Sequence, residues 1–339
     1  MDTYTSLPKP FFVLAPMDDV TDTVFRQMIA DCAPPDLYFT EFANVDGLQS
    51  PGRPRLLKKL KHASRDQPGV ISDQPLVAHI WGKNPDNFYK TAQQIASGEL
   101  GNFVGIDLNM GCPVKTVVGH GVCSALIKDR PLAHDIIQAV QDGVAGSNRT
   151  LPVSVKTRLG YGQVDLTWHE FLLGHNLDML TVHGRTRAQM SKVPADWELI
   201  GEVRQLRDRL SPDTLVVGNG DVLSRGHGIE LAEKYGLDGI MIGRGVFHDP
   251  FVFAEASPWD TVPERQRIEL FSRHVDLFAA TWQEGERPIH TLNKFCKIYI
   301  NGFDGAKELR EQFMAADSIR QLQEMITDAV KPPVKNFTK

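Results

Sequence analysis

Short runs of apolar and often β-branched residues recur along the chain up to about residue 253. Eight such runs predict strands buried on both faces, as in a parallel sheet covered by helices. Segments between them, such as 132–142 and 198–210, carry apolar residues at helical spacing. The eight runs are residues 11–15, 37–40, 76–80, 104–108, 152–156, 179–183, 214–218 and 239–242.

Eight strands that alternate with helices predict a (β/α)8 TIM barrel. A doubly wound open sheet is the alternative, and it would normally carry a glycine fingerprint after its first strand. Here Ala15 is followed by Pro-Met-Asp, which favours the barrel.

The β-rich runs stop after Phe253, and Pro258 and Pro263 bracket a predicted linker. Helical spacing follows in four segments, residues 265–284, 289–300, 305–315 and 318–329. We therefore expect a barrel domain over residues 1–255 and a small helical domain over residues 256–339.

Composition narrows the class of protein. With 42% hydrophobic and 23% charged residues, the chain has enough apolar material for a core and is not predominantly disordered. No apolar run reaches the length of a membrane helix, and the N-terminus resembles no signal peptide. The net charge of −5 argues against coating nucleic acid through bulk charge, but leaves room for a local basic patch. The cysteines are scattered, which predicts a reducing cytoplasm: Cys32, Cys112, Cys123 and Cys296.

Polar or small residues follow nearly every predicted strand. In a barrel of this type the carboxyl ends of the strands meet at one mouth, where catalytic groups lie. We therefore expect one site built from these residues: Pro16, Met17, Asp18, Glu41, His79, Asn109, Cys112, Lys156, Arg158, His183, Asn219, Gly243 and Arg244.

Two glycine-rich turns, residues 217–221 and 242–246, follow the last two strands. Such turns form the usual phosphate site of this fold, because backbone N–H groups can face an anion. Arg244 can add a positive charge. The alternative is that the glycines serve only tight turns.

Lys156 and Cys112 suggest the chemistry. A lysine at the end of a buried strand is costly unless it meets an anion, which is either a ligand such as a flavin or a structural carboxylate. Cys112 lies in a loop between Gly111 and Pro113, where we do not expect burial. An ordinary thiol is mostly protonated at neutral pH, so Cys112 can act as an acid or as a nucleophile.

At these residues the sequence resembles the tRNA-dihydrouridine synthases of bacterial type. Two of the shared elements, Asn-Met-Gly-Cys-Pro (109–113) and His-Gly-Arg-Thr (183–186), are highly specific. The others are Ala-Pro-Met (15–17), Val-Thr-Asp (20–22), Thr-Glu-Phe (40–42), Val-Ser-Val-Lys-Thr-Arg-Leu-Gly (153–160), Ala-Asp-Trp (195–197), Asn-Gly-Asp (219–221) and Met-Ile-Gly-Arg-Gly (241–245).

The resemblance implies an FMN enzyme that uses NADPH to reduce selected uridines in tRNA. It implies that Cys112 protonates C5 of the uracil and that hydride from flavin N5 reaches C6. Asn109 and Arg158 would address the uracil, and Lys294 and Lys297 in the tail would contact tRNA. The residues implied for FMN are Pro16, Met17, Asp18, His79, Lys156, His183, Asn219, Gly220, Asp221, Gly243 and Arg244.

Two positions depart from the family pattern. His79 stands where the family usually has a glutamine at the flavin pyrimidine edge. The stretch Gly121-Val122-Cys123-Ser124 replaces two glycines of a glycine-rich loop. The flavin contact and the mobility of this loop are therefore expected to differ.

Other features carry weaker expectations. A basic run, made of Arg53, Arg55, Lys58, Lys59, Lys61 and Arg65, is either a solvated helix face or a tRNA contact. His169 and His175 do not share a helix face, so we expect no metal. We expect a monomer with no membrane association. The competing functions are a flavin barrel acting on a free pyrimidine and an RNA-binding protein on an inactive barrel.

Overall fold

The computed structural model describes residues 4–63, 74–283 and 285–331. The chain divides into two compact units, Met1–Gly245 and Val246–Lys339. The sequence predicts the boundary between residues 255 and 256. In the structure, residues 246–255 instead group with the helical unit. Each unit is described by itself.

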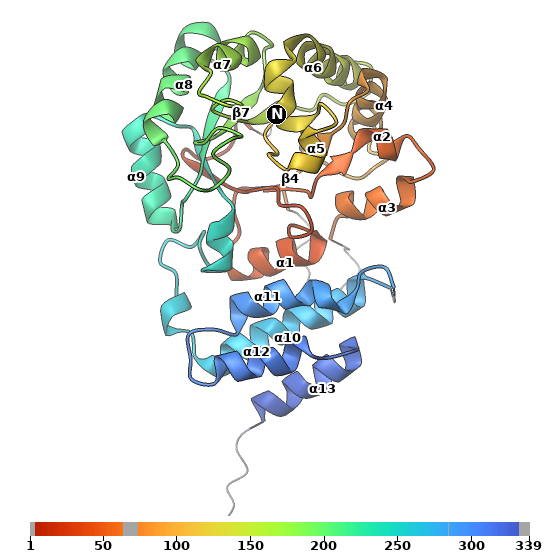
Figure 1. The fold of residues 1–339 in the computed structure, drawn as a ribbon, viewed down its shortest axis with the longest axis vertical. Helices are drawn as coiled ribbons and strands as arrows, with labels where there is room; N and C mark the ends of the chain where they lie inside the picture. Colours follow the sequence, from red (N-terminus) through yellow and green to blue (C-terminus); the bar gives the residue numbers. More distant parts are fainter. Residues whose placement is uncertain (1–3, 64–73, 284, 332–339) are drawn as a thin grey trace, which may run out of the picture. The chain divides into compact units, whose positions relative to one another are not determined.

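The first unit is a closed barrel of parallel strands, which confirms the predicted fold class (Figure 1). The pairing of β2 with β4 closes the ring. The short β3 also pairs with β4, beyond β2, so the second barrel strand is interrupted at residues 40–42. The strands are β1 (Phe11–Leu14), β2 (Leu37–Phe39), β3 (Ala43–Asn44), β4 (Leu76–Trp81), β5 (Gly105–Asn109), β6 (Val153–Arg158), β7 (Met179–His183), β8 (Leu215–Asn219) and β9 (Gly239–Ile242).

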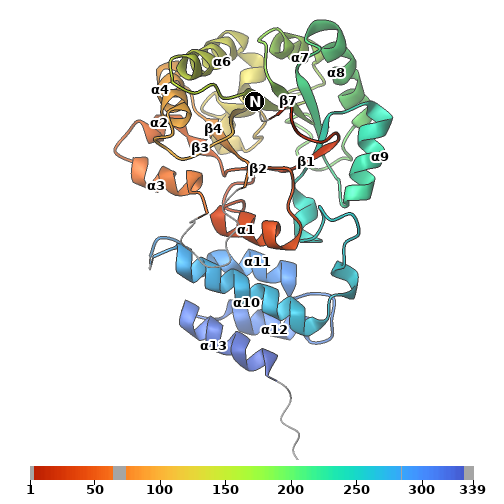
Figure 2. The same cartoon turned by 180° about the vertical axis from the view of Figure 1, so that it is seen from behind.

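Helices surround the strands, as Figures 1 and 2 show from opposite sides. Side-chain caps fix where several of them begin. Asp22, for example, accepts a hydrogen bond from the backbone N–H of Phe25 and starts the first helix. The helices are α1 (Thr23–Cys32), α2 (Val45–Leu48), α3 (Arg53–Leu57), α4 (Pro85–Ala96), α5 (Lys115–Val118), α6 (Arg130–Ala145), α7 (Leu166–Leu173), α8 (Trp197–Leu210) and α9 (Arg225–Tyr235).

Apolar side chains fill the barrel interior. One buried cluster joins residues from six strands, among them Val13, Val77, Val217 and Met241. Because strand side chains alternate between the two faces, the next inward position toward the carboxyl end of β4 is His79. The barrel interior is therefore apolar along most of the strands and becomes polar toward their carboxyl ends, where the mouth lies.

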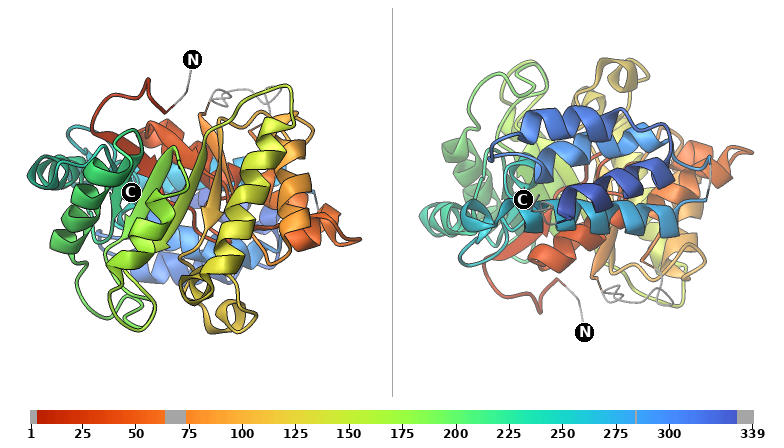
Figure 3. Two further views of the ribbon diagram at one scale, coloured as in Figure 1. Left: turned by 90° about the horizontal axis from the view of Figure 1, so that it is seen from above. Right: turned by 90° about the horizontal axis from the view of Figure 1, so that it is seen from below.

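The second unit consists of helices that lie side by side (Figure 3). Phe271 of the first helix stacks on Phe313 with a centroid distance of 5.8 Å, and buried His274 packs against Phe295. The tail segments expected to be helical are helical, although the end of the first, residue 284, lies outside the described residues. None of the described helices has the length and apolarity to cross a bilayer. The helices are α10 (Glu264–Thr281), α11 (Leu292–Tyr299), α12 (Ala306–Met314) and α13 (Ile319–Val330).

Candidate functional site

Strand register brings the predicted polar residues together at the carboxyl ends of β5 to β8. Asn109 lies opposite Lys156. His183 lies between Arg158 on one neighbouring strand and Asn219 on the other. Five of the predicted site residues are therefore neighbours across four adjacent strands.

Lys156 is held inside this group by an amide. Its Nζ donates to Oδ1 of Asn219 over 3.2 Å, and Nδ2 of Asn219 donates to the carbonyl of Met241. Burial and then the nearby Arg158 lower the pKa of Lys156 to about 8. No carboxylate within residues 4–63, 74–283 and 285–331 forms an ion pair with Lys156. The geometry therefore favours an anionic ligand over a structural ion pair.

Three buried polar atoms at the mouth have no hydrogen-bond partner in the described part of the chain. They are Nε2 of His79, Nδ2 of Asn109 and Nδ1 of His183. A buried polar group without a partner costs about 1–3 kcal/mol. Burial, followed by Arg158 and Lys156, also lowers the pKa of His183 well below its usual value, so its ring is neutral. Together with Lys156, these atoms fit a planar ligand that offers both donors and acceptors, as a flavin ring does.

His79 is fixed by a chain of hydrogen bonds that the sequence did not predict. Its Nδ1 lies 2.6 Å from Oδ2 of Asp107, and Oδ1 of Asp107 accepts from Ser154 over 2.6 Å. Burial lowers the pKa of His79 despite this carboxylate. The neutral ring then donates from Nδ1 to Asp107 and presents Nε2 as an acceptor.

Cys112 is only 8% exposed, so the expectation that its loop position disfavours burial was wrong. The physical reason is that Asn109 folds the loop back on the barrel. Its Oδ1 accepts from the backbone N–H of Gly111 and of Cys112. Nε of Arg158 donates to the Gly111 carbonyl over 2.7 Å and ties the same loop to β6.

Arg158 serves the scaffold as well as the mouth. Its Nη1 donates to the carbonyls of Thr186 and Met190. Within the described residues its Nη2 makes no hydrogen bond, which leaves one donor nitrogen for a ligand. A role for Arg158 toward the uracil stays a prediction.

The two glycine-rich turns meet around Asp221. Its carboxylate pairs with Arg244 over 3.0 Å and with Arg185. Asp221 therefore orients two arginines rather than facing an anion itself. Gly220 has φ +138°, a backbone conformation that favours glycine. Arg185 was missed by the sequence analysis, although it is the arginine of the His-Gly-Arg-Thr element.

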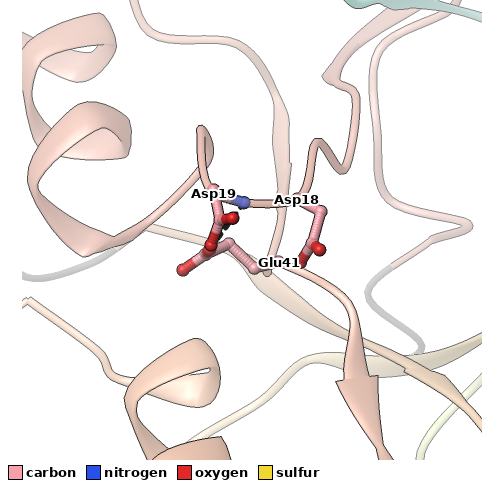
Figure 4. A group of neighbouring side chains, drawn as sticks. All are labelled: Asp18, Asp19 and Glu41. Atoms are coloured by element: carbon pink, nitrogen blue, oxygen red, sulfur yellow. Dashed lines mark hydrogen bonds between the residues drawn. The ribbon is translucent and has the colours of Figure 1, made fainter. Parts of the chain in front are cut away.

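The loop after β1 carries Pro16, Met17 and Asp18, of which Pro16 is buried, Met17 half-buried and Asp18 exposed. Figure 4 shows Asp18 and Asp19 beside Glu41, which follows β2. Lys59 pairs with Asp18 and lies 3.7 Å from Asp19 and 3.9 Å from Glu41. The three carboxylates therefore share one ammonium, which offsets one of their three negative charges, and we assign no metal to the group.

The basic run is partly used within the protein. Arg53 pairs with Glu99, and Lys59 pairs with the acidic group just described. Arg65 lies outside the described residues. In the second unit, Lys294 is half-buried and Lys297 is exposed on α11.

The fold is that of the TIM-barrel class, and the mouth gathers a buried lysine and buried polar atoms that suit an anionic, hydrogen-bonding ligand. A family model described as dihydrouridine synthase matches residues 13–332. The chain therefore belongs to the dihydrouridine synthase family, and it is an oxidoreductase.

Similar proteins support this assignment over nearly the whole length. The probable tRNA-dihydrouridine synthase 2 of Bacillus subtilis (strain 168) is 46% identical over 329 residues, covering 96% of this chain and 95% of that protein. The probable tRNA-dihydrouridine synthase of Staphylococcus aureus (strain COL) is 43% identical, covering 96% and 94%.

A solved structure shares the fold. The crystal structure of DHODH in complex with ferulenol from Eimeria tenella matches with a TM-score of 0.50 and 12% identity. The match covers 69% of this chain and 76% of that one. At this identity the likeness concerns the barrel alone.

Proposed function

We propose that this protein reduces the C5–C6 bond of uridines in tRNA to 5,6-dihydrouridine, with FMN as bound cofactor and NADPH as hydride donor. The family membership and the names of the similar proteins support this reaction. The observation that carries it is the mouth itself, where Cys112 lies on a loop tied to Asn109 and Arg158, beside Lys156.

The residues at the mouth fit FMN. Lys156 would offer its ammonium to the anionic side of the ring, and Nε2 of His79 would accept from a ring N–H. Arg244, oriented by Asp221, would meet the phosphate with the backbone of the two glycine-rich turns. The other residues that we assign to the cofactor are Pro16, Met17, Asp18, His183, Asn219, Gly220 and Gly243.

When bound, FMN supplies to C6 of the uracil the hydride that NADPH provides. The protein supplies the proton. Cys112 gives its Sγ proton to C5 and is left as a thiolate beside the positive Arg158. Nδ2 of Asn109, which has no partner in the described part of the chain, would donate to the uracil.

The uridine must leave its base stack to reach the mouth. We assign the grip on the tRNA to the helical unit, through Lys294 and Lys297. The relatives match over the tail as well as the barrel, and an enzyme acting on a free pyrimidine would not need that tail. The four cysteines are free, which suits a reducing cytoplasm, and we propose a monomer there.

Two half-reactions test the proposal. NADPH should bleach the flavin of the wild-type and of Cys112→Ala at similar rates, because the thiol takes no part in that step. Reoxidation by tRNA should fall by roughly 10²-fold in Cys112→Ala, the usual worth of a positioned acid. Serine should not rescue it, because a hydroxyl is a far weaker acid than a thiol.

Cys32→Ala is the matched control, and both of its half-reactions should stay normal. Denatured protein should release FMN and not FAD. A normal rate of flavin reoxidation by tRNA in Cys112→Ala would contradict the proposed role of this thiol.

A further inference from the structure

Cys123 lies against Cys112 although the two are eleven positions apart in the chain. The two buried cysteines and Val122 form one cluster. Ser124 draws the two segments together, because its Oγ donates to the carbonyl of Cys112 over 2.7 Å. The loop that carries Cys112 is therefore packed directly on the turn that carries Cys123.

Cys123 also has an unusual backbone. Its φ is +55°, in the left-handed region that non-glycine residues rarely adopt. Strained residues of this kind are kept where surrounding structure needs the side chain, and they concentrate at functional sites. Here the residue with positive φ carries a thiol that packs in one buried cluster with the thiol of Cys112.

The surroundings of the Cys112 sulfur favour its charged form. A hydrogen bond with the Cys123 side chain is the largest influence that lowers the pKa of Cys112, and the backbone N–H of Val114 and the cation Arg158 act in the same direction. Burial and the carboxylate of Asp18 oppose them. The net result is that the hydrogen bond from Cys123, the largest cause, helps to lower the pKa of Cys112 to about 7.

Cys123 itself stays protonated. Burial and the neighbouring Cys112 raise its pKa well above the usual range. One thiol of the pair is thus fixed as the hydrogen-bond donor and the other as the group that can lose a proton.

From this geometry we propose that Cys123 is a positioning residue, whose S–H donates to the sulfur of Cys112 and stabilises the thiolate left after Cys112 has protonated the substrate. This inference rests on the proposed role of Cys112 as the acid. The S–H bond of Cys112 breaks, a C–H bond forms at C5, and the negative charge on sulfur is shared with Cys123, Val114 and Arg158. The donor of Cys123 acts like an oxyanion hole for sulfur.

The test compares two replacements of Cys123 in the flavin-loaded enzyme. Cys123→Gly removes the donor and suits the positive φ, so the turn should keep its shape. Cys123→Ser keeps a donor. The pKa of Cys112 is read from the pH dependence of its alkylation by iodoacetamide, followed at that peptide by mass spectrometry.

We expect wild-type Cys112 to titrate near 7 and Cys123→Gly to titrate toward the ordinary thiol value of about 8.5. Cys123→Ser should stay close to the wild-type. The rate of flavin reoxidation by tRNA should fall above the pKa of the Cys112 thiol. The alkaline limb of this pH–rate profile should therefore move to higher pH in Cys123→Gly. The plateau rate of reoxidation in Cys123→Gly should fall by roughly threefold to tenfold, because Cys112 is then a weaker acid.

Cys32→Ala is the matched control, because it removes a thiol outside this cluster and leaves Cys112, Cys123 and Ser124 in place. It should not shift the titration. An unchanged titration and an unmoved limb in Cys123→Gly would overturn the inference, as would a serine variant that behaves like glycine. If Cys112→Ala still reoxidises normally with tRNA, the proposed function fails instead, so the two failures are separable.

Discussion

Asp107 shows how one buried carboxylate sets the chemistry of its neighbour. It accepts from Nδ1 of His79 and from Ser154, and so fixes which ring nitrogen of His79 is protonated. The family resemblance implies a glutamine at the position of His79, and a lone imidazole could turn either nitrogen to a ligand. The carboxylate removes that ambiguity, so that Nε2 remains an acceptor.

Asp107→Asn should therefore weaken FMN binding. The amide introduced at position 107 can donate to Nδ1 of His79, which would put the ring proton of His79 on Nε2. The Nε2–H would then face the N–H of the flavin ring, and neither group could accept. Losing this contact and leaving buried groups unpaired costs about 1–3 kcal/mol, or roughly 5- to 150-fold in the dissociation constant. Titration of the apoprotein with FMN, followed by flavin fluorescence, measures it.

The control is the same change in a His79→Gln background. Glutamine has no tautomers, so Asp107→Asn should cost less there, and the difference isolates the His79–Asp107 coupling. Equal losses of FMN affinity in both backgrounds would rule out the tautomer as the cause.

At the scale of elements, the strands place the candidate site, and the short helix α11 carries the two lysines that we assign to tRNA. Lys294 and Lys297 are three residues apart, so they lie on neighbouring turns of one helix face. Phe295 and Cys296 of the same helix are buried and anchor it. Lys297 is exposed, whereas Lys294 is half-buried and its Nζ lies 5.5 Å from the centroid of the Phe295 ring.

Charge reversal of both residues, Lys294→Glu with Lys297→Glu, should weaken tRNA binding and leave flavin reduction by NADPH intact. Each lost phosphate contact should also lower the slope of log affinity against log salt by about one. Binding measured by filter retention at several salt concentrations gives both quantities.

Lys307→Glu with Arg320→Glu is the matched control, because it makes the same charge change on α12 and α13 of the same unit. If the α11 variant and this control bind tRNA equally well at every salt concentration, the assignment of α11 to tRNA is wrong.

At the scale of the whole molecule, buried neutral histidines in both units link stability to pH. Burial lowers the pKa of His169 in the barrel to about 4 and that of His274 in the tail to about 3, against an ordinary 6.5. The unfolded chain binds these protons more readily than the folded one. The free energy of unfolding is therefore not reduced by these histidines above pH 6.5. It falls as the pH drops from 6.5 toward the pKa values of the two histidines in the folded protein.

At pH 5.5 each of these histidines should cost about 1.4 kcal/mol relative to pH 7.5. His274→Asn removes the titrating group and keeps a polar atom near the hydroxyl of Tyr299. The variant should lose less stability between pH 7.5 and 5.5 than the wild-type does, as measured by thermal unfolding. A drop equal to that of the wild-type would exclude His274 as a source of the acid sensitivity.

The sequence alone determined the barrel, because local signals carry it. Each buried strand is a short apolar run, each helix has its own period and caps, and neither depends on distant residues. The motifs after the strands also marked where the mouth lies, since parallel strands must bring their carboxyl ends to one edge. The β2–β3 interruption was missed, because the run at residues 37–40 gives no sign of where its pairing with β4 breaks off and resumes.

Tertiary structure decided which residues act on one another. The partnership of Cys112 with Cys123, of His79 with Asp107 and of Arg185 with Asp221 each joins segments at least eleven residues apart. Burial of Cys112 depends on a local turn made by Asn109 and on the distant Arg158, which ties the loop to β6 and which no local pattern encodes. Hydrogen bonds and pKa values depend on three-dimensional distance and solvent exclusion, so the sequence could mark candidate residues but not the neighbours that tune them.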